Sequence, residues 1–484
     1  MRRLATLVFF MALAGAVRAD FQKGLDAWNA GDYKSAVDEF KQAADKNDAR
    51  AQFYLGEAFN KGRGVVQDYA EAVTWYSRAA EQNSADAQET LCNMYFFGQG
   101  TVQQDFAAAA KFCTAAGKQG RAYPAYLGGY LYEFGKGVAI DLAQAGSLYK
   151  VAADAGNLDA QEALGRMYFF GQGVTQDYVE AAKWNRKAAE QGRSFPQFLL
   201  GYAYDYGKGV EKNPAEAAAW YRKAAEQGDG RAMAALGYLY SQGNGVPKDD
   251  AEATKWYLAA ADRGETSVYS TLGWAFYQGS GVAADGAQSI KWFSRAADGG
   301  DVQAQFMVGY LNETGKAGTK NPAEAVKWYS KAAAAGSTDA MEALGRLYFA
   351  GDGVPVNYAE SAKWYQKPAE NGNTYAQFLL GYMHESGKNG LQADPTQAVK
   401  WYKTAAEKGD PRSQFHLGWL CFEGKGVSAD PVLGHMWSNL AAAQLSGDER
   451  SAAEKQRDYI GSKLTPAQLA KAQQMARDWK PKKQ

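Results

Sequence analysis

The sequence predicts an all-α protein: a right-handed superhelical α-solenoid of about eleven helix pairs, with capping helices at both ends. Two observations predict it, namely a fixed sequence period and a helix-start signal that keeps the same place in every period. A period between 20 and 50 residues is typical of solenoids and outweighs the division into about three globular domains that the length of 484 residues would suggest. A Leu-Gly pair or its equivalent recurs every 36 residues, and twice after 37, at Leu55, Leu91, Gly128, Leu164, Leu200, Leu236, Leu272, Val308, Leu344, Leu380 and Leu417.

The first helix of each unit is predicted from apolar residues at helical spacing. In one clean copy Ala160, Leu164, Gly165 and Tyr168 fall on one side of a helix, with the glycine where a neighbouring helix must approach closely. A Gly-x-Gly loop follows at 171–173, and glycine supplies the positive φ that ends a helix. Because these loops recur without the Lys-Ser/Thr of a phosphate-binding loop, we interpret them as structural turns.

The second helix of each unit begins at an Asp or Asn. In nine of the eleven units a Glu or Gln stands three residues later, which predicts a capping box. Nine of the thirteen tryptophans share one slot of this helix, which indicates packing and not a cofactor. The start residues are Asp68, Asp105, Asp141, Asp177, Asn213, Asp249, Asp285, Asn321, Asn357, Asp394 and Asp430.

These motifs resemble a known repeat. The pattern L-G-x-x-Y, G-x-G-V and A-x-x-W-Y-x-x-A-A is similar to the Sel-1-like repeat (SLR), a relative of the tetratricopeptide repeat, over residues 49–445. The resemblance implies a helical solenoid that acts as an adaptor, in a family that includes exported bacterial factors. Residues 20–48 resemble a tetratricopeptide-like cap without the glycine loop, and we expect residues 446–484 to form closing helices and a basic tail.

The first nineteen residues are predicted to be a signal peptide. Arg2 and Arg3 precede an apolar run over 4–17, and small residues at Val17 and Ala19 suit a signal peptidase. Since the run is shorter than the ~20 residues of a membrane span, we expect cleavage, with an uncleaved anchor as the alternative. The mature chain is then expected to be periplasmic or secreted and not membrane-spanning.

Composition disfavours several classes of function. Lys+Arg and Asp+Glu both number 53, so no global basic field favours nucleic acid. His384, His416 and His435 are the only histidines, and no catalytic triad, acid–base pair or phosphate loop is recognisable. We therefore expect no enzyme, no cofactor and no metal, although a surface metal site among the three histidines stays an alternative.

Two cysteines are candidates for a disulfide. Cys92 and Cys113 occupy the inter-helix contact positions of one unit, and an exported protein folds under oxidising conditions. A bridge closing this 21-residue loop would contribute about 3 kcal/mol. Two buried free thiols are the alternative, and Cys421 is expected to be inert in the core.

Helical geometry places a second set of residues on the opposite side of the first helix, which lines the concave groove in related solenoids. The slot after the glycine is aromatic in seven of eleven units, and one turn earlier four aromatic residues form i,i+4 pairs with it. Packing of these rings against neighbouring first helices is the alternative to a binding role. The predicted partner-binding residues are Tyr130, Arg166, Tyr202, Tyr238, Trp274, Tyr310, Arg346, Tyr382, Trp419, Tyr126, Phe198, Phe306 and Phe378.

Tyr, Trp and Arg interleaved with acids are typical of protein-binding surfaces. We therefore expect a non-enzymatic exported scaffold that binds a protein partner through this groove. Binding of glycan or peptidoglycan in the cell envelope is the alternative, because aromatic platforms beside carboxylates also suit sugars. Hydrolysis of cell-wall or β-lactam substrates is a more distant third function.

Overall fold

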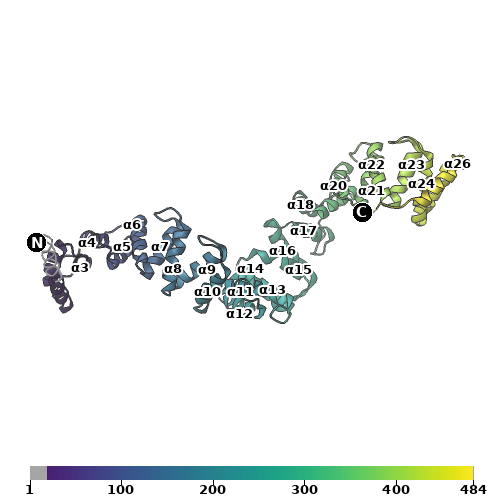
Figure 1. The fold of residues 1–484 in the computed structure, drawn as a ribbon. Coiled ribbons are helices and arrows are strands. Elements are labelled where there is room, and N and C mark those ends of the chain that lie inside the picture. Colours follow the sequence, from purple (N-terminus) through teal and green to yellow (C-terminus); the bar gives the residue numbers. More distant parts are fainter. Residues whose placement is uncertain (1–18, 483–484) are drawn as a thin grey trace. The chain divides into compact units, whose positions relative to one another are not determined.

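The computed structural model describes residues 19–482. The secondary-structure elements in this range are all helices (Figure 1). The predicted signal peptide therefore lies outside the described residues, apart from Ala19. The chain divides into two compact units, an amino-terminal unit up to Asp249 and a carboxy-terminal unit from Asp250. The 36-residue period continues through this point, so the sequence does not predict the division.

The amino-terminal unit begins with helical residues 19–30 and continues as antiparallel helix pairs. Its further helices are α2 (Tyr33–Asp45), α3 (Ala49–Lys61), α4 (Tyr69–Glu81), α5 (Ala85–Phe97), α6 (Phe106–Lys118), α7 (Ala122–Phe134), α8 (Leu142–Asp154), α9 (Leu158–Phe170), α10 (Tyr178–Glu190), α11 (Ser194–Tyr206), α12 (Pro214–Glu226) and α13 (Gly230–Gln242).

The carboxy-terminal unit repeats the same hairpin and closes with two further helices. Its helices are α14 (Asp250–Asp262), η1 (Thr266–Val268), α15 (Tyr269–Gln278), α16 (Gly286–Asp298), α17 (Val302–Thr314), α18 (Pro322–Ala334), α19 (Thr338–Ala350), α20 (Tyr358–Glu370), α21 (Thr374–Ser386), α22 (Pro395–Glu407), α23 (Pro411–Glu423), α24 (Pro431–Gln444), α25 (Gly447–Gly461) and α26 (Pro466–Asp478). No helix among residues 19–482 combines the length and apolarity that a membrane crossing needs.

The Leu-Gly pair marks the contact between the two helices of a hairpin. Leu200 is fully buried, and a Cβ added to Gly201 would lie 2.6 Å from the ring of Tyr221 on the second helix. The same approach recurs between Gly309 and Tyr329. The glycine predicted to admit a neighbouring helix therefore admits the aromatic ring of its own hairpin partner.

The Gly-x-Gly loop links the two helices of one hairpin and also contacts the previous hairpin. Gly171 ends α9 in the left-handed conformation, with φ 69°. At Gly173, where φ is 73°, an added Cβ would lie 2.2 Å from the carbonyl oxygen of Leu142, at the start of α8. The second glycine is thus required both by its backbone conformation and by a close contact between successive units.

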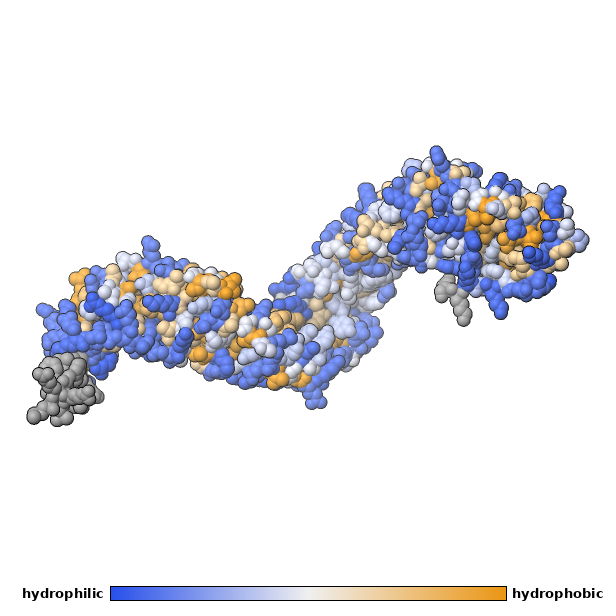
Figure 2. Space-filling model, turned by 45° about the horizontal axis from the view of Figure 1, so that its top comes forward, coloured by the Kyte–Doolittle hydropathy of each residue, from blue (hydrophilic) through white to orange (hydrophobic). Residues whose placement is uncertain are grey.

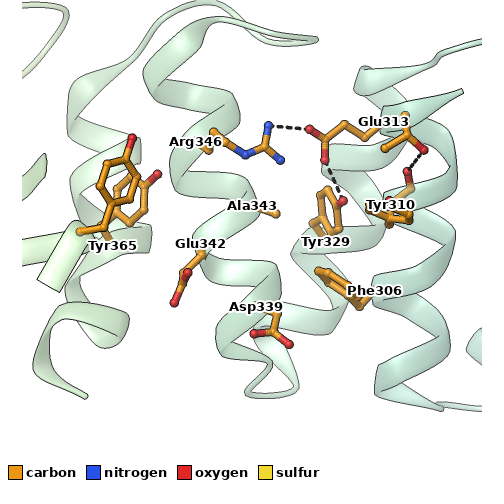
Figure 3. A pocket seen from close by; sticks show the side chains of 11 residues that line it. Phe306, Tyr310, Glu313, Tyr329, Asp339, Glu342, Ala343, Arg346 and Tyr365 are labelled. Carbon is orange, nitrogen blue, oxygen red and sulfur yellow. Dashed lines mark hydrogen bonds and ion pairs between the residues drawn. The ribbon is translucent and has the colours of Figure 1, made fainter. Parts of the chain in front are cut away.

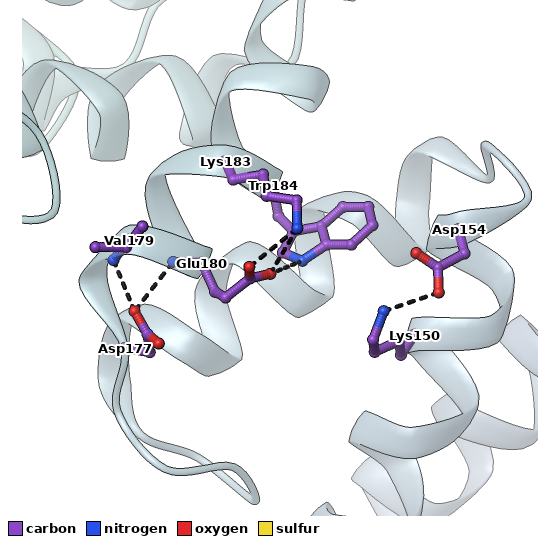
Figure 4. Close-up of polar contacts among 7 residues, drawn as sticks. All are labelled: Lys150, Asp154, Asp177, Val179, Glu180, Lys183 and Trp184. Carbon is purple, nitrogen blue, oxygen red and sulfur yellow. Dashed lines mark hydrogen bonds and ion pairs between the residues drawn. The ribbon is translucent and has the colours of Figure 1, made fainter.

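In the ten second helices whose N-cap contacts the structure describes, the side-chain caps form as predicted but the reciprocal capping boxes do not. Asp177 accepts hydrogen bonds from the backbone N–H groups of Val179 and Glu180, while Glu180 pairs with Lys183 and accepts from the Trp184 indole (Figure 4). The box is not completed because the backbone N–H of Asp177 donates instead to the carbonyl of Tyr168 at 3.1 Å, which leaves Glu180 to pair with Lys183. Among the helix starts described, the reciprocal box is formed at Thr465 and Gln468.

Glutamines connect successive hairpins inside the core. Gln197 donates to the backbone carbonyl of Ala189 at 3.0 Å and accepts from Gln227 at 2.7 Å. The arrangement repeats with Gln161 and Gln191. This ladder satisfies buried amides that the apolar pattern of the sequence did not reveal.

Aromatic clusters close both ends of the repeat region. Trp28 packs on Phe40 and Tyr54 before the first repeat, at centroid distances of 6.0 and 5.6 Å. After the last repeat, Trp479 packs edge-on against Trp437 at 5.9 Å. These rings cover the apolar faces that a terminal hairpin would otherwise expose.

Candidate functional site

The predicted partner-binding residues all lie on the first helices, and none is fully buried. Tyr238 and Arg346 are exposed, and the other eleven are half-buried. In the amino-terminal unit these are Tyr126, Tyr130, Arg166, Phe198 and Tyr202. In the carboxy-terminal unit they are Trp274, Phe306, Tyr310, Phe378, Tyr382 and Trp419. We call this side of the first helices the first-helix face.

The slot residues contact the neighbouring first helix while keeping part of their surface open. Tyr202 of α11 packs edge-on against Phe169 of α9 at 5.5 Å, and Tyr382 of α21 packs likewise against Phe349 of α19 at 6.0 Å. Both interpretations of these aromatics, packing and exposure, therefore apply to the same rings.

The expected aromatic i,i+4 pairs are largely replaced by another contact. Phe378 and Tyr382 are in ring contact at 6.5 Å. Phe306, by contrast, packs against Tyr329 at 5.4 Å, on the second helix of its own hairpin. The earlier aromatic thus turns inward, because the glycine beside it leaves room for the second-helix ring.

A buried tyrosine, a glutamate and an arginine form one motif of this face. The Tyr329 hydroxyl donates to Glu313 at 2.8 Å, and Glu313 pairs with Arg346 of the next hairpin at 2.6 Å (Figure 3). Burial, then the bond to Glu313, raises the pKa of Tyr329 above its ordinary value. The bond to Glu313 likewise raises the pKa of Arg346. Arg346, which was predicted to bind a partner, therefore forms an ion pair within the chain.

The same motif recurs with changes elsewhere. Glu133 accepts from Tyr149 at 2.7 Å and pairs with Arg166, whereas Glu385 accepts from Tyr402 at 2.7 Å and from His416 at 2.9 Å. Burial alone would raise the pKa of Glu385, but the bonds from His416 and Tyr402 outweigh it and lower that pKa.

Asp205 departs from this motif. It is 7% exposed and forms no hydrogen bond or ion pair within residues 19–482. Aspartate is one methylene shorter than glutamate, and the next slot holds Tyr238 instead of an arginine. Burial raises the pKa of Asp205, with Lys212 opposing it.

An exposed aromatic row lies at the last residue of four successive first helices, a feature that the sequence analysis missed. We define the aromatic row as Phe97, Phe134, Phe170 and Tyr206, whose exposed fractions are 57, 55, 49 and 55%. Hydrophobic residues also form patches among hydrophilic ones on the surface in Figure 2. The signal was available in the sequence, since these residues precede the first loop glycine in four consecutive units.

Each row member contacts another aromatic ring: Phe97 and Phe170 contact the preceding phenylalanine, and the other two contact slot tyrosines. Tyr206 lies 4.4 Å from Tyr202, and Phe134 lies 4.8 Å from Tyr130, both as ring centroids. A cavity of about 380 Å³ opens beside Phe97 and Tyr130. In the carboxy-terminal unit the equivalent positions are Gln278, Thr314, Ala350, Ser386 and Glu423.

Three first helices carry an Asp and a Glu three residues apart, and we call each a carboxylate pair. Asp159 and Glu162 face Arg193 of the next hairpin, which contacts the first and lies 3.6 Å from the second. Asp86 and Glu89 face Arg121 in the same way. The third pair, Asp339 and Glu342, has Asn373 at the corresponding position.

The two tryptophans predicted to be the strongest contacts differ in surroundings. Trp274 packs edge-on against Phe293 at 5.3 Å, while Trp419 lies 6.1 Å from Tyr459 of the capping helix α25. Both stay half-buried. The capping helix therefore takes part of the Trp419 surface.

The cysteines are buried, and the structure pairs two of them. Cys92 and Cys113 form a disulfide, with Cα atoms 4.8 Å apart, and both are fully buried. Burial raises the pKa of the Cys421 thiol to about 11. Within residues 19–482, no group of three or more His, Cys, Asp or Glu side chains is placed to hold a metal ion.

Comparison with known proteins identifies the repeat. The crystal structure of a protective antigen present in uropathogenic Escherichia coli strains, which displays an SLR fold, is 33% identical over 92% of this chain and 94% of its own, with a TM-score of 0.56. A Sel1 repeat protein from Oxalobacter formigenes is 29% identical over 63% of this chain and 87% of its own, with a TM-score of 0.47. Among curated proteins, none matches the chain.

The Sel1 repeat is matched eleven times in register with the hairpins, and scaffold proteins built from it typically mediate protein–protein interaction. The matched residues are 49–84, 85–120, 125–157, 158–192, 197–229, 230–265, 272–301, 302–337, 338–373, 374–410 and 411–444. The chain therefore belongs to the Sel1 repeat family.

Proposed function

We propose that this chain is an exported, non-enzymatic scaffold that binds a protein partner through its first-helix face. The aromatic row is the observation that carries the proposal. Four rings, each about half exposed, follow one another on α5, α7, α9 and α11. Exposed aromatics backed by further rings supply large contact area at low entropic cost, which is how protein-binding hot spots are built.

The slot residues extend this contact surface. Tyr238 is 51% exposed on α13, the next first helix along the chain. Tyr130, Tyr202, Trp274, Tyr310, Tyr382 and Trp419 contribute partial surfaces. Export rests on the leader predicted over 1–19, and the buried Cys92–Cys113 disulfide supports it, because such bonds persist in oxidising compartments.

Paired substitutions test the protein-binding role. The immobilised chain is used to capture partners from envelope and culture fractions, which are identified by mass spectrometry. Phe134→Ala with Phe170→Ala should abolish capture of a partner that the wild type retains. Ile140→Ala with Val179→Ala is the matched control, since these apolar residues are 66 and 63% exposed but lie outside the row. Unchanged circular dichroism must accompany the loss.

Capture that survives the row variants would contradict a role for the amino-terminal unit. Trp274→Ala with Trp419→Ala then tests the carboxy-terminal unit in the same assay. Export is tested separately, by fractionating cells and sequencing the amino terminus of the mature chain. A start at Asp20 supports cleavage, whereas an intact leader in the cytoplasm contradicts it.

Glycan binding is the second candidate, favoured by the cavity beside Phe97 and Tyr130. Its lining combines aromatic rings with Gln104 and Lys136, the polar groups that would orient sugar hydroxyls. Retention on purified peptidoglycan, lost in Phe97→Ala, would support this function over protein binding.

A further inference from the structure

We propose that the cavity between α17, α19 and α21 is a binding site for an arginine side chain of the protein partner. The cavity encloses about 420 Å³, and Asp339 and Glu342 lie in its wall (Figure 3). The inference rests on the proposed function and specifies the chemistry that the partner must present.

The chain itself shows what a carboxylate pair of this geometry binds. The segments Ala85–Leu91, Leu158–Leu164 and Thr338–Leu344 each place an Asp and a Glu one turn apart near a first-helix start. In the first two, a guanidinium from the next hairpin lies between the carboxylates. An arginine is therefore the ligand that the repeat already uses at this position.

In the third segment the chain supplies no arginine to the carboxylate pair. Arg121 and Arg193 occupy the N-cap positions of α7 and α11 and give up helix capping to reach the acids. Asn373, at the same position of α21, caps its own helix through Ala376 and donates one bond to Glu342 at 2.7 Å. Asp339 forms no hydrogen bond or ion pair within residues 19–482.

A second, independent group points into the same cavity. Tyr365 is 2% exposed, lines the cavity and forms no hydrogen bond among the described residues. The equivalent Tyr329 donates to Glu313, but the corresponding position on α19 is Phe349, which cannot accept. A guanidinium N–H in the cavity would give the Tyr365 hydroxyl a hydrogen-bond partner.

The remaining lining fits a guanidinium better than an ammonium. Phe306 supplies an aromatic ring on which a planar cation can stack, and Tyr375 already binds one guanidinium in this way, since Arg412 lies 5.2 Å from its ring centroid. Three carboxylates, Glu313, Asp339 and Glu342, oppose one cation, Arg346, which Glu313 already neutralises. The cavity thus keeps two uncompensated negative charges, and two carboxylates one turn apart match the forked donors of arginine.

Calorimetric titration of the full chain with N-acetyl-arginine methylamide tests the site, with N-acetyl-lysine methylamide as the paired probe. We expect one binding site for the arginine probe and roughly tenfold weaker binding of the lysine probe. Asp339→Asn should weaken arginine binding at least about tenfold. Asp159→Asn is the matched control, because its pair is already occupied, and should leave binding unchanged.

Asn373→Arg gives a test that removes no acid. The introduced side chain should occupy the pair as Arg193 does and abolish probe binding without loss of helical circular dichroism. Equal binding of both probes, or full binding to the Asn373→Arg chain, would overturn the proposal. Partner capture that depends on the aromatic row but not on Asp339 would leave the proposed function intact while the arginine site fails.

Discussion

The two units are built from the same type of helical hairpin but present different surfaces. The amino-terminal unit exposes the aromatic row and fills both of its carboxylate pairs with its own arginines. The carboxy-terminal unit has polar or small residues at the row positions and leaves Asp339 and Glu342 without an internal arginine. Both units are built from the same type of helical hairpin, so the difference in surface lies in a few side-chain positions.

This contrast separates two ways in which a repeat can recognise a partner. Exposed rings contribute apolar contact area with little directional preference, whereas an open carboxylate pair selects a charged group by geometry. Within this chain the first belongs to the amino-terminal unit and the second to the carboxy-terminal unit. A partner that engages both would present an apolar segment and a separate arginine.

Removing the disulfide should produce the largest difference between the units. Cys92→Ala with Cys113→Ala is expected to lower the unfolding free energy of the amino-terminal unit by about 3 kcal/mol, since the bond closes a 21-residue loop. Denaturant unfolding followed by hydrogen exchange would locate the loss. Cys421→Ala, in the other unit, is the control, and equal destabilisation of both units would contradict the prediction.

Asp205 should give the next largest effect. Because burial raises its pKa in the folded state, the charged form costs stability as pH rises through that raised value, and the penalty vanishes below the ordinary 3.8. Asp205→Asn should therefore stabilise the amino-terminal unit by about 1 kcal/mol at pH 7 and by nothing near pH 3. Urea midpoints at the two pH values measure this. A gain that persists at pH 3 would assign the effect to packing.

A smaller change in stability is expected in the carboxy-terminal unit, where the glutamine ladder is interrupted. The side-chain carbonyl of Gln305 is buried without a partner, because Ala335 stands where Gln227 serves Gln197. Ala335→Gln should add about 0.5 kcal/mol of stability by restoring that bond. Thermal unfolding of this variant is compared with that of Ala334→Gln, which adds the same side chain one residue earlier. Stabilisation of the first variant alone would assign the gain to the ladder bond.

The substitution with the smallest expected free-energy change should give the amino-terminal unit an open carboxylate pair like that of the carboxy-terminal unit. Arg193→Asn loses exposed ion pairs but regains a helix cap, so stability should change by no more than about 0.5 kcal/mol. Its carboxylate pair becomes open, and calorimetry should then show a second site for N-acetyl-arginine methylamide. An unchanged stoichiometry would mean that the carboxylate pair needs the Tyr365 hydroxyl as well.

Some of the candidate site could be predicted from sequence and some could not. Helical spacing placed Tyr202 and Tyr382 on the first-helix face, where the structure has them half-buried. The pairing of Arg346 with Glu313 crosses 33 residues and depends on the stacking of two hairpins, which no local pattern encodes. The inward turn of Phe306 depends on the ring of Tyr329.

By itself the sequence determined the repeat, its helix pairs and their boundaries, because spacing, capping residues and loop glycines act within a dozen residues of one another. Only the tertiary structure decided which surface groups are occupied. Whether a carboxylate pair is filled depends on a residue one hairpin away, as Arg193 and Asn373 show. That difference arises from contacts between neighbouring hairpins, and a periodic pattern treats those neighbours as equivalent.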